Sequence, residues 1–261
     1  MVVGRKPRKY RKKQKDKDKQ TEKKKKKTPL EKKQRRNQII SGVLMLMIAL
    51  TFVLIQAFKE DYKVLDVKNQ YNTKITYTSS SAIINYTDET GEHNNKWFNM
   101  DYIEAFEFLN ETESQNANVF CWWDYGHGIK GYAEKNPVLR NPSSEILYSV
   151  ASSEYITEYD EHESIELVSR SFSETNNSNF LDILSTQSME YVFVGKEDIQ
   201  KASVMYNVSN IDATKMIMKN DKGNLEFTLE GQKSMIAKLI MKKEIGLDII
   251  YEDEYVLIYG V

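Results

Sequence analysis

The feature that most constrains this chain is a run of twenty residues, 39–58, that contains no charged side chain. Twenty helical residues span about 30 Å, which is the thickness of the hydrocarbon core of a bilayer. A helix buried in a protein core is the alternative. However, the run has no polar stripe and is bounded by Arg36 and Lys59, which is typical of a membrane span. The sequence therefore predicts a single transmembrane helix.

The segment before this run is strongly basic. Residues 1–38 carry 19 Lys or Arg against four Asp or Glu, and the rest of the chain carries a net charge of −16, so the formal net charge of −1 averages two opposite segments. Basic segments remain on the cytoplasmic side of a membrane. We therefore expect a single-pass protein of the cell membrane, with a cytoplasmic amino terminus and an extracytoplasmic segment 59–261.

The basic tail, residues 1–38, has almost no apolar side chains and is predicted to be disordered, because it cannot bury enough surface to offset its chain entropy. Its simplest role is to set the topology. A net charge of +15 also attracts anionic lipid or the ribosome, in a salt-dependent way. Tyr10 is its only aromatic residue, which argues against sequence-specific RNA recognition.

The part after the apolar run has the pattern of a mixed α+β domain. Loose alternation of apolar residues over 62–86 predicts short strands, which we assign to a β segment at 59–96. A larger domain is expected at 97–261. In it, the periodicity predicts helices at 97–109, 143–172, 197–206 and 232–243, and strands at 118–121, 191–194, 225–229, 249–251 and 255–259.

Cysteine and histidine usage excludes several kinds of site. A single cysteine, Cys121, excludes an internal disulfide framework and any Cys-based zinc cluster. The three histidines, His93, His127 and His162, lack the spacing of metal ligands. We therefore expect no Cys- or His-based metal site in this chain.

Five consecutive residues form the most unusual local feature: Trp122, Trp123, Asp124, Tyr125 and Gly126, directly after the predicted strand 118–121. Indole N–H groups only donate hydrogen bonds, a carboxylate only accepts them, and a glycine permits a sharp turn. Grouped at a strand end, they can form a small pocket that suits a hydroxyl group, which both donates and accepts. The alternative is two core tryptophans beside an acidic turn residue.

A second pattern, DxxKxxxM, places Asp198, Lys201 and Met205 after the predicted strand 191–194. At positions i, i+3 and i+7 they share one face of a helix, which would present a carboxylate, an ammonium and a thioether together. The alternative is an exposed Asp–Lys pair beside a core methionine. A competing pair, Asp212 and Lys215, lacks a methionine at the matching offset.

Residues 122–126 match, residue for residue, the WWDYG signature of the oligosaccharyltransferase catalytic-subunit family, the dolichyl-linked oligosaccharide–protein glycosyltransferases. The second pattern is similar to one that archaeal members carry. Over 97–261 the chain therefore resembles the carboxy-terminal globular domain of that family. One departure is Tyr206, because the archaeal pattern usually continues from methionine to isoleucine.

The resemblance implies a role for each motif residue. Trp122, Trp123 and Asp124 would bind the hydroxyl of the Ser or Thr in an Asn-x-Ser/Thr acceptor, and Met205 would contact a threonine methyl. Asp198 and Lys201 would shape the site rather than react. The remaining motif residues, Tyr125 and Gly126, are assigned to the same substrate-binding site.

The resemblance also shows what is missing. Family members are far longer, and their further membrane spans hold the lipid-linked sugar and the acidic residues that bind a divalent metal, Mg or Mn. The resemblance therefore implies no catalytic residue, no metal ligand and no cofactor in this chain. The metal would belong to a separate multispanning partner subunit, so whether the chain is an enzyme stays open.

Three hypotheses follow. In the first, the chain is the sequon-recognition half of a split oligosaccharyltransferase. In the second, it is a non-catalytic, membrane-anchored peptide-binding module. In the third, it is an accessory protein of the translocon or ribosome, and the basic tail is its functional element.

Overall fold

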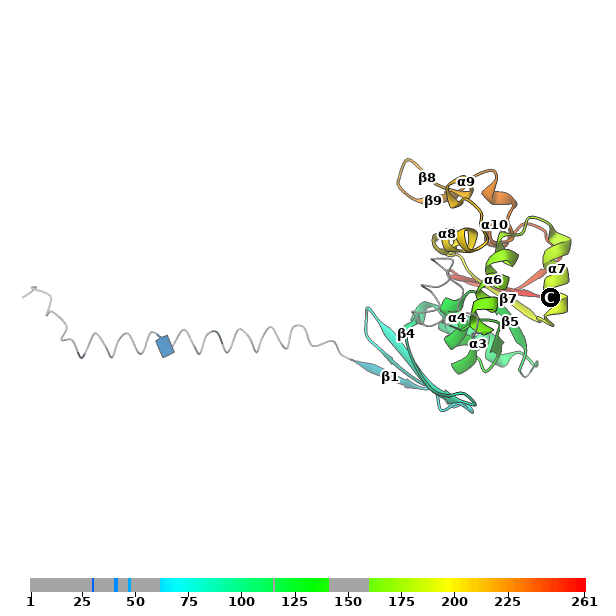
Figure 1. Ribbon diagram of the computed structural model, residues 1–261. Coiled ribbons are helices and arrows are strands. Elements are labelled where there is room, and N and C mark those ends of the chain that lie inside the picture. Colours follow the sequence, from blue (N-terminus) through cyan, green and yellow to red (C-terminus); the bar gives the residue numbers. More distant parts are fainter. Residues whose placement is uncertain (1–29, 31–39, 42–46, 48–61, 115, 141–159) are drawn as a thin grey trace, which may run out of the picture. The chain divides into compact units, whose positions relative to one another are not determined.

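The computed structural model describes residues 30, 40–41, 47, 62–114, 116–140 and 160–261. The predicted tail and apolar run lie outside the described residues except at Leu30, Ile40, Ser41 and Met47, so the transmembrane helix stays a prediction. Among the described residues, no helix has the length and apolar character needed to cross a membrane. Residues 60–261 form one compact unit (Figure 1).

The unit begins with a four-stranded antiparallel sheet of order β1-β2-β3-β4. Its buried face includes Ile75 and Ile84, which are paired neighbours on β2 and β3 and are fully inaccessible. The first three strands confirm the alternation seen in the sequence. The strands are β1 (Lys63–Asp66), β2 (Lys74–Tyr77), β3 (Ala82–Asp88) and β4 (Gly91–Phe98).

Strand β4 corrects the predicted helix at 97–109. Trp97 and Phe98 belong to β4, where Phe98 pairs with Ala82. Because residues 92–96 are all polar, this strand has no apolar alternation to reveal it. The helical segment starts later, as η1 (Met100–Tyr102) and α3 (Ile103–Glu111), and Asn99 begins it by accepting a hydrogen bond from the Asp101 amide.

A five-stranded mixed sheet of order β10-β11-β7-β5-β6 forms the centre of the domain. Strand β5 runs parallel to β6 and β7, and β11 runs antiparallel to β7 and β10. The mixed α+β prediction is therefore confirmed. The strands are β5 (Asn118–Cys121), β6 (Asn136–Pro137), β7 (Tyr191–Gly195), β10 (Asp248–Glu252) and β11 (Val256–Gly260).

The helices meet the predictions only in part. The helix predicted at 197–206 is present but begins two residues later, and the one at 232–243 is shorter. Of the segment 143–172, only 160 onward is described, and it is helical. Helices at 123–131, 177–186 and 213–216 and a strand at 217–219 were not predicted, whereas the strand at 225–227 lies within the one predicted at 225–229. The elements are α4 (Trp123–Gly131), α6 (Asp160–Ser173), α7 (Asn177–Thr186), α8 (Ile199–Val208), α9 (Ala213–Met216), β8 (Ile217–Lys219), β9 (Leu225–Phe227), η2 (Gly231–Lys233) and α10 (Met235–Ile240).

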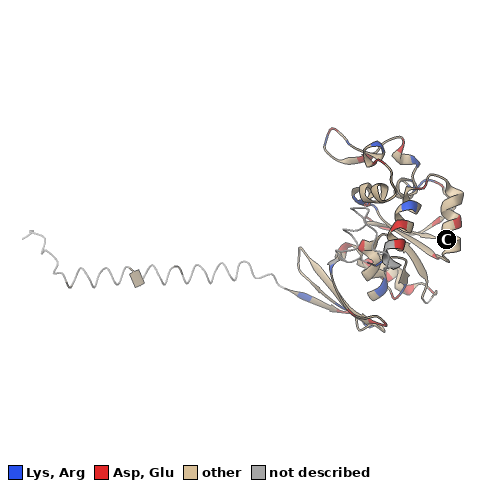
Figure 2. Cartoon of the chain, viewed as in Figure 1, with Lys and Arg blue, Asp and Glu red and all other residues tan. Residues whose placement is uncertain are grey.

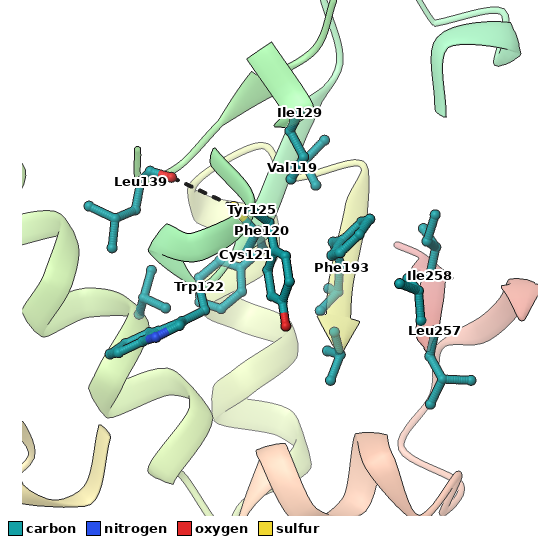
Figure 3. Packing of buried hydrophobic residues seen from close by; sticks show 14 of the residues in the cluster. Val119, Phe120, Cys121, Trp122, Tyr125, Ile129, Leu139, Phe193, Leu257 and Ile258 are labelled. Atoms are coloured by element: carbon teal, nitrogen blue, oxygen red, sulfur yellow. Dashed lines mark hydrogen bonds between the residues drawn. The ribbon is translucent and has the colours of Figure 1, made fainter. Parts of the chain in front are cut away.

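Helices cover both faces of the mixed sheet. On one face, Phe193 of β7 stacks on Phe106 of α3, with ring centroids 5.5 Å apart. Phe193 also contacts Tyr125 of α4, with ring centroids 4.8 Å apart (Figure 3). On the other face, Phe120 of β5 meets Phe172 of α6 edge-on at 5.2 Å. All five rings are almost fully buried, so the sheet is the middle layer and α4 is anchored on it.

The structure corrects the expectation that Gly126 makes a sharp turn. Residues 123–126 are the start of α4, and Gly126 lies within that helix. Its lack of a side chain serves close packing instead, because a Cβ there would lie 2.3 Å from the Leu139 carbonyl oxygen and 2.5 Å from the Arg140 Cα.

We predict that Gly126→Ala lowers the free energy of unfolding by about 1–3 kcal/mol, the usual range for overpacking a core. Alanine favours helices over glycine, but the atoms that it would meet are backbone and cannot rotate away. Chemical denaturation measures the change. Gly260→Ala is the control, because its Cβ would meet only the end of the Ile250 side chain, at 3.3 Å. Equal stability of Gly126→Ala and the parent would refute the packing role.

Candidate functional site

The candidate site lies at the start of α4. Trp122 precedes the helix in an extended conformation (φ −74°, ψ 154°), and its ring stacks on that of Trp123 with centroids 4.0 Å apart. Trp122 is only 1% exposed, whereas Trp123 is half-buried. One tryptophan is therefore a core residue and the other reaches the surface. Asp124 follows in the first turn, where the helix dipole favours an acidic side chain.

Lys201 of α8 joins the two sequence motifs. Its Nζ lies 2.8 Å from Asp124 Oδ2 and 3.0 Å from Asp198 Oδ1, and it donates a hydrogen bond to the Tyr125 hydroxyl at 2.9 Å. The same ammonium lies over the Tyr125 ring, 4.4 Å from its centroid. Residues that lie far apart in the sequence thus share one cation.

Asp198 is the buried end of this cluster. Its side chain is fully inaccessible, and it accepts hydrogen bonds from the Tyr125 hydroxyl and, at 2.9 Å, from the Gly195 amide. With Lys201 as a third donor, the buried carboxylate is well compensated. Asp198 therefore connects the end of β7 to both α4 and α8.

Burial and charge act in opposite directions on these groups. Burial raises the pKa of Asp198, and Lys201 opposes that rise. For Lys201, burial by itself lowers the pKa, but the carboxylates of Asp198 and Asp124 outweigh burial, so its pKa is raised and the ammonium persists at neutral pH. Burial also keeps the pKa of Tyr125 well above its ordinary value, so the phenol stays a donor.

Charge elsewhere on the domain is mixed. Figure 2 shows basic and acidic residues spread over its helices and strands. The cluster itself sets one ammonium against two carboxylates, so the ionised cluster carries a net negative charge.

The surface of the site is small. Asp124 keeps 31% of its side chain exposed and Lys201 keeps 23%. Among the described residues, the ion-pair partner of Asp124 is Lys201, which lies against Asp124 Oδ2. The other carboxylate oxygen, Oδ1, can therefore accept a hydrogen bond from a ligand. Beside the exposed part of Trp123, this arrangement can bind a small group that donates a hydrogen bond.

Met205 does not contribute to that surface. It is fully buried and packs in the core, so the expectation that it contacts a threonine methyl has no accessible surface to support it. Tyr206, the departure from the archaeal pattern, is also fully buried, and its hydroxyl lies 2.7 Å from Ser234 Oγ. That hydrogen bond explains how the core accepts a tyrosine at this position.

Sequence reasoning missed Tyr102. This half-buried residue of η1 meets the Tyr125 ring edge-on, with centroids 5.3 Å apart. Lys201 and Asp198 are close enough to affect its pKa, which burial raises. No local pattern marks Tyr102, because its partners come from distant segments.

Cys121, the Asp212–Lys215 pair and the acidic residues do not form a further site among the described residues. Cys121 is buried, and its pKa is raised by burial, so it is a poor nucleophile (Figure 3). Asp212 accepts a hydrogen bond from the Thr214 amide and caps α9, which explains the competing Asp–Lys pair as a capping motif. Among the described residues, no three His, Cys, Asp or Glu side chains are grouped to hold a metal ion.

The chain is similar in sequence to two glycosyltransferase subunits. No protein-family model matches the chain. Over 71 residues it is 30% identical to the dolichyl-diphosphooligosaccharide–protein glycosyltransferase subunit stt-3 of Caenorhabditis elegans, covering 27% of this chain and 9% of that protein. Over 69 residues it is 29% identical to subunit STT3B of Arabidopsis thaliana, covering 26% and 9%.

Two solved structures from Archaeoglobus fulgidus are also similar. One is the C-terminal globular domain of an oligosaccharyltransferase, with 19% identity and a TM-score of 0.47 over 63% of this chain and 98% of that one. The other is oligosaccharyltransferase AglB in complex with an inhibitory peptide and a dolichol-phosphate, with 17% identity and a TM-score of 0.43 over 60% and 23%. The sequence relatives confirm the predicted resemblance to oligosaccharyltransferase subunits, although the chain matches only about a tenth of their length.

We predict that Lys201→Met lowers the free energy of unfolding at pH 7 by about 2–3 kcal/mol, because it leaves the buried Asp198 carboxylate without its cation. Burial already raises the pKa of Asp198, and loss of the ammonium raises it further. A folded-state pKa above the unfolded value means that stability increases as the pH falls through it. The difference in free energy of unfolding between Lys201→Met and the unsubstituted protein should therefore be smaller at about pH 5 than at about pH 7.

Chemical denaturation at the two pH values tests this. Lys233→Met is the matched control, because it removes an exposed i,i+3 pair with Glu230 and should change little. Adding Asp198→Asn to Lys201→Met should recover stability at pH 7. A loss of unfolding free energy in Lys201→Met that is the same at both pH values would contradict the role of Lys201 in compensating the Asp198 carboxylate.

Proposed function

We propose that this chain is a membrane-anchored sequon-recognition domain that acts in protein N-glycosylation and binds the Ser or Thr hydroxyl of Asn-x-Ser/Thr acceptors. The observation that carries the proposal is the Asp124–Lys201 pair beside the half-buried Trp123. These residues belong to the two motifs that resemble the oligosaccharyltransferase family. The sequence relatives, which are glycosyltransferase subunits, support the same role.

The chemistry of the site is suited to a hydroxyl. Lys201 pairs with one carboxylate oxygen of Asp124 and so fixes the carboxylate. The other oxygen can accept a hydrogen bond from the hydroxyl of the ligand. The indole ring of Trp123 provides an apolar wall and one N–H donor. A valine side chain, which has the shape of threonine but no hydroxyl, would leave these polar groups unsatisfied.

Transfer of sugar is proposed to need a partner. Residues 59–261 would lie on the extracytoplasmic side of the cell membrane. A separate multispanning subunit would supply the divalent metal and the lipid-linked oligosaccharide. One solved relative was crystallised with a tethered acceptor peptide containing an NVT sequon, which is the class of ligand proposed for this chain. In the alternative, the chain binds peptides but no partner makes it catalytic.

We predict that the full chain binds an Asn-x-Thr peptide and that Asp124→Asn weakens binding about 10- to 100-fold, the range for losing a charge-assisted hydrogen bond. Isothermal titration calorimetry gives the affinities. Replacing Thr by Val in the peptide should weaken binding to the unsubstituted protein by a similar factor. The same replacement should weaken binding to Asp124→Asn little further, because both changes remove the same contact.

The matched control is Asp182→Asn, an exposed aspartate on α7 that is not part of the cluster. It should bind like the parent. Equal affinity of the parent for the Thr and Val peptides would reject the proposed recognition of the hydroxyl.

We further predict that sugar transfer to an Asn-x-Thr peptide appears only when the chain is co-expressed with a multispanning subunit, and that Asp124→Ala abolishes it. Gel-shift or mass analysis of the peptide measures transfer. Peptide binding without transfer in any pairing would favour the non-catalytic binding module over the split enzyme.

A further inference from the structure

A second buried polar cluster lies where the four-stranded sheet meets α4. Its centre is Asp88, the last residue of β3, whose side chain is fully inaccessible. Asp88 Oδ1 accepts hydrogen bonds from the Thr90 amide at 2.8 Å and the Thr90 hydroxyl at 2.7 Å, and it lies 2.9 Å from His93 Nε2. The β3–β4 hairpin thus holds a buried carboxylate in one orientation.

Arg140 is the cation of this cluster. Its Nη1 lies 2.8 Å from Asp88 Oδ2, and that oxygen accepts no well-aligned hydrogen bond from the residues that the structure describes. Burial by itself raises the pKa of Asp88, but hydrogen bonds from Thr90 and His93, with the charge of Arg140, bring it well below the ordinary value. Arg140 is thus the ion-pair partner of a buried carboxylate, and the fixed position of that carboxylate restrains the guanidinium.

The backbone of Arg140 in turn packs against the candidate site. A Cβ on Gly126 would lie 2.5 Å from the Arg140 Cα and 2.3 Å from the Leu139 carbonyl oxygen, so this backbone lies directly on the first turn of α4. Gly126 is two residues from Asp124. An ion pair that fixes Arg140 therefore fixes the surface on which the Trp123–Gly126 turn rests.

Strand β3, which carries Asp88, also contacts α4 directly through Tyr86. The Tyr86 hydroxyl of β3 lies 2.8 Å from His127 Nδ1, and the Tyr86 ring packs on Gly131, where a Cβ would lie 2.5 Å from the ring. Burial is the main cause that lowers the pKa of His127 to about 4, so its ring is neutral at physiological pH. Strand β3 thus restrains both the first turn and the end of α4.

We propose that Arg140 is a positioning residue for the candidate site: Asp88 of the four-stranded sheet holds its guanidinium, and its backbone sets the orientation of Trp123 and Asp124. Arg140 does not touch the ligand. Its effect on peptide binding rests on the proposed function, whereas its effect on the stacked tryptophans does not.

The test compares Arg140→Ala and Arg140→Lys in the full chain. Arg170→Ala is the matched control, because it removes the ion pair of an exposed arginine with Glu166 on α6. Two readouts are taken well below the thermal transition: the near-ultraviolet circular dichroism of the stacked Trp122–Trp123 pair and the affinity for an Asn-x-Thr peptide. A merely structural role would lower the melting temperature without changing either one.

Arg140→Ala should change the tryptophan dichroism and weaken peptide binding about 3- to 30-fold, the range for a residue that acts through another. Arg140→Lys, which keeps the charge but not the fork of donors, should show smaller changes in the same direction. Arg170→Ala should match the parent in both readouts.

Dichroism identical to the parent, with affinity within about twofold of it in both Arg140 variants, would overturn the proposal. If Arg140→Ala does not fold, Arg140→Lys decides by the same readouts. If the parent binds no peptide, the proposed function fails, and the dichroism alone decides the role of Arg140.

Discussion

The arrangement of the site depends on one buried interaction, the contact of the Lys201 ammonium with the carboxylates of Asp198 and Asp124. Asp198 is fully buried at the end of β7 and requires compensation, which Lys201 supplies from the first turn of α8. Once fixed there, the ammonium attracts Asp124 from α4. The ammonium thus holds α4, which follows β5, beside α8, which follows β7 in the same sheet.

This arrangement divides the WWDYG residues into two groups. Trp122 and Tyr125 are buried and anchor the turn, through the stacked tryptophan ring and the hydrogen bond to Asp198. Trp123 and Asp124 point to the surface and are the groups a ligand can reach. Because most of the motif is structural, substitutions within it should separate into changes of stability and changes of affinity.

The other restraint on α4 comes from the four-stranded sheet. The Asp88–Arg140 pair and the contact of Tyr86 with His127 hold the helix from the side of β3. The α4 helix therefore packs against two sheets, and its glycines permit the close approach that this requires. An acceptor pocket that discriminates a hydroxyl from a methyl needs such rigidity, since small displacements weaken hydrogen bonds steeply.

Sequence reasoning named several residues that the structure brings together in the candidate site, and it missed others for physical reasons. The motifs led to Asp124, Asp198 and Lys201, because their spacing is local and their chemistry is distinctive. Met205 was placed on the ligand side because helical spacing alone does not distinguish a buried face from an exposed one.

Four other features were missed or misread for related reasons. Strand β4 escaped notice because its residues are polar. Gly126 was read as a turn residue, although its true constraint is the distant backbone of Leu139 and Arg140. Tyr102 and Arg140 gain their roles only through tertiary contacts, which one sequence does not reveal.

The most direct test of the central claim is to locate a bound acceptor by photocrosslinking. An Asn-x-Thr peptide carrying a diazirine residue next to the threonine would be irradiated with the full chain, and the adducts mapped by mass spectrometry. The account predicts adducts at Trp123, Asp124 and the neighbouring part of α8, and their loss when threonine is replaced by valine. Adducts confined to other elements, such as the β8–β9 hairpin, or equal labelling by the valine peptide, would contradict it.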